Sequence, residues 1–149
     1  MDGVRPIAFT LRLAGEAVEL DGGRYWAETQ VVSLGADLPG ASDGIDFGEA
    51  ICRRQLDLWA DGSLVQAGEM TFGDDGAVTF RARGTLGASP DPAVRHGTAI
   101  LEVTGGRGRL AGARGFVTSN FLLADSGELT DHHLGLLFLE RPAQEGNAP

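Results

Sequence analysis

Hydrophobic and polar residues alternate along most of the chain with a spacing of two, which is typical of half-buried β-strands. No long stretch shows the three-to-four spacing of a helix, and only "RLAGEAVEL" (12–20) is expected to form one or two helical turns. Eight strands are predicted, at residues 7–13, 25–34, 47–59, 64–72, 77–83, 98–104, 114–123 and 133–140.

Short turns join these strands. "WADGSL" (59–64) and "FGDDGAV" (72–78) each contain an Asp-Gly pair, which supplies the positive φ that a tight hairpin needs. The chain has 23 glycines among 149 residues, about twice the usual ~7 %, as expected for many turns. Eight sequential antiparallel strands predict an all-β fold, a closed up-and-down barrel, with a two-sheet sandwich as the alternative.

The length suits one domain, predicted over residues 1–141 and followed by a polar, disordered tail at 142–149. Two connections are longer than the rest, at 35–46 and 84–97, and contain Gly, Pro, Ser and Asp. Each is interpreted either as a lid at the barrel mouth or as a plain surface linker.

The net charge of −9 disfavours nucleic acid as a partner, because an acidic surface repels phosphate. One cysteine, Cys52, rules out an internal disulfide and fits a cytoplasmic location. The N-terminus lacks the apolar core of a signal peptide, and no apolar run approaches the ~18 residues of a membrane span. We therefore expect neither nucleic acid nor membrane as a partner.

The segment "VTGGRGRLAGARGFVTSNF" (103–121) has a cluster of glycines and arginines between two predicted strands. A phosphate-binding P-loop would need a Lys followed by Ser or Thr and then a helix, and none follows here. "GRGRLAG" (106–112) misses the dinucleotide fingerprint by one residue and again precedes a strand. This glycine-rich segment is therefore predicted to be a turn.

The glycine-rich segment resembles that of allene oxide cyclases and the wider dirigent-like barrels, which carry TGG-x-G-x-x-x-G-A-x-G between two strands. The matching positions here are Thr104, Gly105, Gly106, Gly108, Gly112, Ala113 and Gly115. The preceding stretch "DGSLVQAGEMTFGDDGAVTFRARG" (61–84) resembles the middle hairpin of small bacterial members, nearest to the spirotetronate-type polyketide cyclases. The resemblance covers residues 44–140.

This resemblance implies an allene oxide cyclase-like, calycin-type barrel and a homodimer. It implies a cofactor-independent, isomerase-like cyclase that acts on a hydrophobic polyketide-type substrate in natural-product biosynthesis, by an intramolecular [4+2] reaction of the Diels-Alderase kind. A non-catalytic small-molecule binder or dirigent-like stereocontrol protein is the alternative. No catalytic residue carries over one by one from these families.

Alternation assigns one side of each strand to the interior. On strand 47–59 this side holds Arg54 among apolar neighbours, and strand 25–34 offers Glu28 as its partner. Arg54 is interpreted either as half of a structural pair or rim residue, or as the group that binds an anionic or enolate oxygen. Gln66 and Ser119 join it as candidate catalytic hydrogen-bond donors.

The remaining inward residues would line the ligand site. The candidate substrate-binding residues are Trp26, Glu28, Gln30, Met70, Phe80, Leu101, Phe121 and His133. His133 is either an inward acid/base or, with His132, a solvated turn residue. The chain has only three histidines and one cysteine, which disfavours a zinc site and with it a metal-dependent cupin-like enzyme. Cys52 is expected to be a core residue and not a nucleophile. No cofactor is expected.

Overall fold

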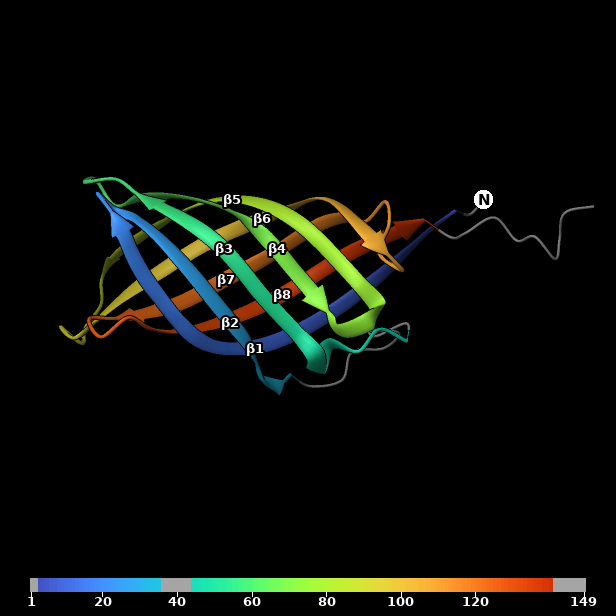
Figure 1. Cartoon of the computed structure of the whole chain (residues 1–149), viewed down its shortest axis with the longest axis horizontal. Coiled ribbons are helices and arrows are strands. Elements are labelled where there is room, and N and C mark those ends of the chain that lie inside the picture. Colours follow the sequence, from blue (N-terminus) through green and yellow to red (C-terminus); the bar gives the residue numbers. More distant parts are fainter. Residues whose placement is uncertain (1–2, 36–43, 141–149) are drawn as a thin grey trace, which may run out of the picture.

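A computed structural model describes residues 3–35 and 44–140, which form one closed barrel of antiparallel strands in chain order (Figure 1). The strands are β1 (Val4–Asp21), β2 (Arg24–Leu34), β3 (Ala50–Leu58), β4 (Ser63–Phe72), β5 (Gly76–Ala88), β6 (Val94–Gly108), β7 (Arg114–Ala124) and β8 (Glu128–Glu140). Two single 3-10 turns, η1 (Phe47–Glu49) and η2 (Gly73–Asp75), precede β3 and β5. The up-and-down barrel is confirmed over the sandwich.

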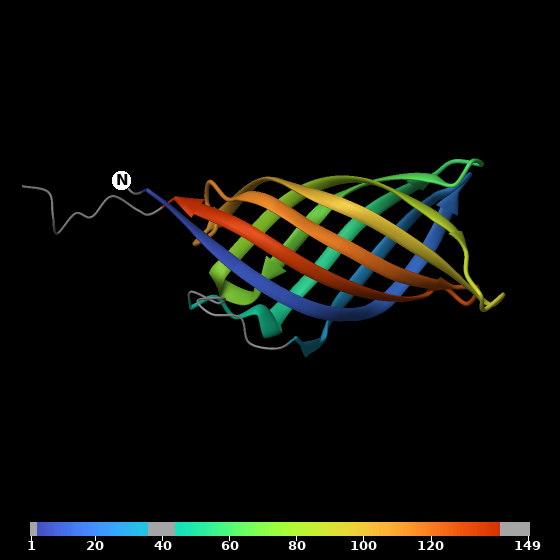
Figure 2. The same cartoon turned by 180° about the vertical axis from the view of Figure 1, so that it is seen from behind.

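The barrel closes because β1 pairs with both β2 and β8. Figures 1 and 2 show β1 and β8 side by side from opposite sides of the molecule. Closure gives every strand two partners and so removes the long open edges of a flat sheet, although residues 4–10 of β1 pair with β8 alone. In the described residues, no helix is both long enough and apolar enough to cross a membrane.

Two segments that were not predicted as strands, residues 12–20 and much of 84–97, belong to strands in the structure. The expected helical turns at 12–20 lie within β1, where residues 12–16 pair with both β2 and β8. Pairing on both sides overrides the weak helical preference of Ala, Glu and Leu. The connection predicted at 84–97 shrinks to 89–93, because β5 and β6 extend toward each other. Residues 36–43 and the tail from 141 lie outside the described residues.

The glycine-rich segment forms a turn between β6 and β7, as predicted. Gly108 and Gly112 have φ of +67° and +77°, which L-residues rarely adopt. Leu110 and Ala113 from the same turn are fully buried against the end of the barrel. The segment therefore reverses the chain and closes this end of the interior at the same time.

Alternation correctly assigned the interior side of β3 to β7, where the inward residues are buried or half-buried. The larger apolar cluster fills the barrel end nearest η1, where Phe47 stacks on Phe9 with ring centres 4.7 Å apart. Phe72 meets Phe47 edge-on at 5.3 Å. A smaller cluster around Phe121 and Leu129 fills the other end.

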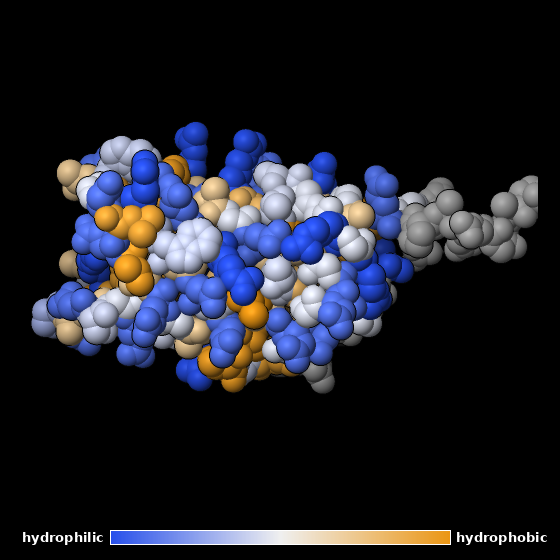
Figure 3. Space-filling view, viewed as in Figure 1, coloured by the Kyte–Doolittle hydropathy of each residue, from blue (hydrophilic) through white to orange (hydrophobic). Residues whose placement is uncertain are grey.

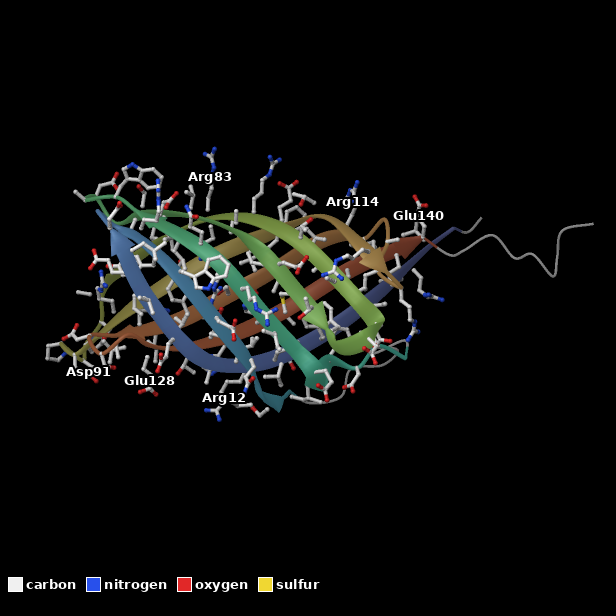
Figure 4. The ribbon with its side chains drawn as sticks, viewed as in Figure 1. Arg12, Arg83, Asp91, Arg114, Glu128 and Glu140 are labelled. Carbon is white, nitrogen blue, oxygen red and sulfur yellow. The ribbon has the colours of Figure 1, made fainter. Side chains whose placement is uncertain are left out.

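Apart from Arg54 and Asp131, which are buried inside the barrel, most charged side chains of the described residues lie on its outer surface. Figure 4 shows Arg12, Arg83, Arg114 and Glu128 pointing away from the barrel. In the view of Figure 3 the surface is mostly hydrophilic, with separate hydrophobic patches. The interior and exterior of the barrel are thus chemically distinct.

Inward glycines leave room for large rings from neighbouring strands. A Cβ at Gly97 would lie 2.1 Å from the Phe121 ring, and a Cβ at Gly135 would lie 2.1 Å from the Phe9 ring. Real Cβ atoms do not approach other atoms so closely, so both rings depend on these glycines. The barrel is packed by pairing large residues with small ones.

Replacing Gly97 with Ala should therefore lower the free energy of unfolding by about 1–3 kcal/mol, because Phe121 must leave its packed position. Gly87→Ala is the matched control on β5, since a Cβ there meets nothing within 4 Å. Urea unfolding of both variants measures the difference. Equal stability of the two variants would contradict this packing.

Candidate functional site

A layer of buried polar side chains separates the two apolar clusters inside the barrel. Its members come from β2, β3, β4, β7 and β8 and are Thr29, Arg54, Gln66, Ser119, Asp131 and His133. Arg54 and Asp131 are both 0 % exposed. Buried ionic groups are costly unless paired, so the contacts within this layer decide its chemistry.

Asp131 is the centre of the layer. Its Oδ2 lies 2.8 Å from Nη2 of Arg54 and 2.8 Å from Nε2 of His133. Its Oδ1 accepts a hydrogen bond of 2.7 Å from the Ser119 hydroxyl. Three side chains from β3, β7 and β8 therefore converge on one carboxylate.

Arg54 crosses the interior from β3 to reach this carboxylate. Its Nη1 donates to Oε1 of Gln66 at 3.2 Å, and its guanidinium carbon lies 5.8 Å from the centre of the Phe121 ring. Its strand neighbours are Ala27 on β2 and Gly68 on β4. A Cβ at Gly68 would lie 2.7 Å from the Arg54 Cβ, so small neighbours make room for the arginine.

The pair stays ionised in the interior. Burial raises the pKa of Asp131, but the charge that His133 carries when protonated, the Arg54 cation and the hydrogen bonds from His133 and Ser119 together lower it by more, so its pKa is well below the usual range. Burial lowers the pKa of the Arg54 guanidinium, but Asp131 more than offsets this and the pKa is raised overall. A fixed cation and a fixed anion therefore face each other in an apolar interior.

Several polar atoms of the layer have no hydrogen-bond partner among the described residues. These atoms are Thr29 Oγ1, Arg54 Nε, Arg54 Nη2, Gln66 Nε2 and His133 Nδ1, of which Arg54 Nη2 still lies in the ion pair with Asp131. Buried polar groups in proteins are nearly always hydrogen-bonded, so a group of unpaired ones needs an explanation. The layer can offer hydrogen bonds to a polar atom of a bound molecule.

The structure brings together most of the predicted site residues. Arg54, Gln66 and Ser119 lie in the polar layer, and His133 is buried with them, which makes the solvated-turn interpretation of His133 wrong. Met70, Phe80 and Leu101 belong to the larger apolar cluster and Phe121 to the smaller one. Their roles toward a ligand remain predictions.

The assignment on β2 was wrong by one residue. Trp26, Glu28 and Gln30 point outward, and Ala27 and Thr29 face the interior instead. Glu28 therefore pairs with the exposed Arg53 at 2.9 Å and not with Arg54. The large Trp26 and Val32 favoured the wrong side, whereas the interior needs the small Ala27 beside Arg54.

Asp131 was missed because the last strand was predicted to begin at His133. β8 begins at Glu128, which places Asp131 on the same inward side as His133. The alternation of Leu129, Asp131, His133, Gly135 and Leu137 carries the signal. Extending the period-two pattern upstream would have found the residue.

Two surface hollows lie near the layer but open outward. One, of about 620 Å³, is lined mainly by the outward residues Arg81, Arg83, Ile100 and Phe116 on β5 to β7. The other, of about 470 Å³, spans β1, β2, β7 and β8 and includes His133. Gln66 lines the first hollow and His133 the second, so each hollow reaches one member of the polar layer, whereas Arg54 and Asp131 line neither.

Cys52 is fully buried, and burial raises its pKa to about 11, although the neighbouring charge of Arg54 acts in the opposite direction. A thiol in this state is a poor nucleophile, in line with its prediction as a core residue. Within residues 3–35 and 44–140, no three His, Cys, Asp or Glu side chains are grouped to hold a metal ion.

The fold is similar to that of a solved protein. The pterocarpan synthase dirigent protein GePTS1 matches with a TM-score of 0.61 and 13 % sequence identity, over 97 % of this chain and 90 % of that chain. At this identity the likeness shows a shared fold, that of a dirigent-like barrel. No protein-family model matches the sequence, and no curated protein matches it significantly.

The buried ion pair of Arg54 and Asp131 leads to a prediction about stability. Arg54→Met should lower the free energy of unfolding by about 3–5 kcal/mol, because it leaves the Asp131 charge buried without its cation. Adding Asp131→Leu should restore much of this loss, because the uncompensated charge is then gone. Urea unfolding of the single and double variants gives the comparison.

The exposed pair Arg81–Glu102, 3.2 Å apart, is the control. Its removal by Arg81→Met and Glu102→Leu should change stability by less than ~1 kcal/mol. An Arg54→Met variant as stable as Arg81→Met would show that Arg54 and Asp131 do not form the buried pair described.

Proposed function

We propose that this protein is a cofactor-independent cyclase that binds a hydrophobic polyketide-type molecule inside the barrel and directs its ring closure. Intramolecular [4+2] addition is the form of ring closure that the family resemblance suggests. The observation that carries the proposal is the buried polar layer, in which fixed charges and unpaired donors lie between two apolar clusters. Ionisable groups whose pKa values are shifted by burial and by a specific charge partner, such as Arg54 and Asp131, are often found at functional sites.

The geometry suits a reaction with few ionisable groups. The apolar clusters would hold a flexible chain in a folded, reactive shape, which reduces the entropy lost at the barrier. Arg54 and Gln66 would donate hydrogen bonds to a conjugated carbonyl oxygen, and their charge and dipole would stabilise negative charge that develops there. Ser119, which donates to Asp131, would hold the carboxylate that orients Arg54.

A ligand would have to displace side chains. Phe121 rests over Arg54, and Phe47 from η1 stacks on Phe9 at the barrel end. Aromatic rings at these places would exclude water from the polar layer before the substrate enters. The proposal therefore requires that one of these rings move when the substrate binds.

A second candidate function is non-catalytic binding that controls the stereochemistry of a reaction. The similarity in fold to a dirigent protein favours it. The polar layer would then orient the molecule by hydrogen bonds without changing it. Binding without rate acceleration would distinguish this candidate from a cyclase.

The same protein is expected to form a homodimer. Six large apolar residues are 40 % or more exposed on the outer side of β6, β7 and β8: Ile100, Phe116, Leu122, Leu134, Leu136 and Phe138. Contiguous apolar surface of this kind is typical of an interface. Sedimentation equilibrium should give twice the chain mass of 15.6 kDa, shifting toward 15.6 kDa in Leu134→Glu; a wild-type protein of one chain mass would contradict the dimer.

The cyclase is tested with a linear trienone, in which an enone and a diene are tethered on one chain. Wild-type protein should accelerate its closure, and Arg54→Met should lose roughly 10²-fold of the rate, as for the loss of one preorganised donor. Arg81→Met, which removes an exposed arginine, should keep the wild-type rate. Product formation is followed by chromatography.

Binding is measured in the same samples by NMR, from shifts of the interior Leu101 and Met70 methyl signals. Shifts without acceleration would favour the dirigent-like binder. The absence of both shifts and acceleration would contradict an interior site for this class of molecule.

A further inference from the structure

The two nitrogens of His133 have different surroundings, and the difference fixes where its protons lie. Nε2 lies 2.8 Å from Oδ2 of Asp131, whereas Nδ1 is buried without a hydrogen-bond partner among the described residues. A carboxylate only accepts hydrogen bonds, so Nε2 must carry a proton and donate it. Neutral His133 therefore presents a bare lone pair at Nδ1.

Every other contact of Asp131 agrees with an ionised, accepting carboxylate. The Ser119 hydroxyl donates to Oδ1, and Arg54 brings its positive charge to Oδ2. The carboxylate is thus held from two other strands and cannot rotate away from His133. An aspartate that fixes the tautomer of a histidine and stabilises its charged form is the arrangement by which hydrolases prepare a general base.

From this geometry we infer that His133, held by Asp131, is a proton-transfer residue whose Nδ1 takes a proton from a hydroxyl group of the substrate. The inference rests on the proposed interior site and adds a substrate class to it. The substrate would carry a hydroxyl or phenol group and a conjugated carbonyl. The donors Arg54 Nε and Gln66 Nε2 would meet the carbonyl oxygen.

The chemistry balances without an oxidant or a cofactor. His133 Nδ1 removes the hydroxyl proton as the oxygen attacks the β-carbon of the conjugated system, so a C–O bond forms. The electrons of the C=C bond move to the carbonyl oxygen, where Arg54 and Gln66 stabilise the enolate. The proton on Nδ1 is then delivered to the α-carbon, and the enolate returns to the carbonyl. The product is a cyclic ether isomer of the substrate.

This reaction differs from a [4+2] closure in one measurable way. A pericyclic closure moves no proton, whereas conjugate addition places a proton from Nδ1 on carbon. Because the hydroxyl proton of the substrate exchanges with solvent before binding, product made in D₂O carries deuterium at the α-carbon.

The tautomer is tested first, by long-range ¹H–¹⁵N NMR of the full chain, in which His96, His132 and His133 are assigned by substitution. Neutral His133 is expected to be protonated on Nε2 and bare on Nδ1. In Asp131→Asn the amide can donate to Nε2 instead, and the proton should move to Nδ1. A wild-type His133 with its proton on Nδ1 would overturn the inference.

The proton transfer is tested with 2′-hydroxychalcone, a phenol that closes onto its own enone. Wild-type protein should accelerate its closure above the buffer rate, and His133→Gln and Asp131→Asn should each lose at least tenfold of that acceleration. His132→Gln is the matched control, because His132 is the neighbouring residue on the outer side of β8 and should not matter. No acceleration by wild type, or equal acceleration by His133→Gln, would overturn the inference.

Circular dichroism and the shifts of the Leu101 and Met70 methyl signals on adding 2′-hydroxychalcone are recorded for each variant. Shifts in a folded protein that does not accelerate closure would overturn the proton-transfer role and leave the interior binding site standing. If the protein accelerates closure of the trienone but not of 2′-hydroxychalcone, the cyclase is supported and the role of His133 as a base is overturned. Absent shifts with both molecules would count against the interior site itself.

Discussion

One carboxylate organises the interior of this barrel. Asp131 is fully buried, and Arg54, His133 and Ser119 contact its two oxygens. An ion pair in this position contributes little net stability, because the cost of removing both charges from water offsets their attraction. Net stability alone therefore does not account for its place between two apolar clusters, and the proposed site gives it a role there.

The rest of the barrel is arranged around that pair. Arg54 reaches Asp131 only because Ala27 and Gly68, its neighbours on both sides, are small. Phe121 covers the guanidinium because Gly97 leaves space for its ring. Closure of the sheet places β8 beside β1, so that β1 and β2 separate β8 from β3 and Arg54 reaches Asp131 across the interior. Larger residues at these small positions should therefore displace Arg54 or Phe121 and so disturb the site.

Much of the fold follows from the period-two pattern. Eight strands, their order and the inward side of β3 to β7 were predicted, because apolar residues alternate clearly there. β2 was assigned the wrong side, since size alone favours Trp26 inside whereas the neighbouring Arg54 demands Ala27. That constraint is tertiary, and the pattern within one strand does not contain it.

The site was predicted in part for the same reason. Arg54, Gln66 and Ser119 stand out as polar residues on apolar faces, and the structure brings Arg54 and Gln66 into contact. Asp131 was not identified because the last strand was predicted to begin at His133, two residues after it. The pairing of Arg54 with Asp131 joins residues on β3 and β8, and only closure of the barrel brings them together.

The ionised state of Asp131 has a consequence for stability. Its pKa is lower in the folded than in the unfolded chain, so its contribution is present above the unfolded pKa near ~3.9 and is lost as the pH falls below it toward the folded pKa. The direct measurement is a ¹³C NMR titration of the Asp131 side-chain carboxyl in the folded protein. The account predicts that the carboxyl remains ionised well below the ordinary aspartate range. Titration at or above ~3.9 would contradict a carboxylate held by Arg54 and His133.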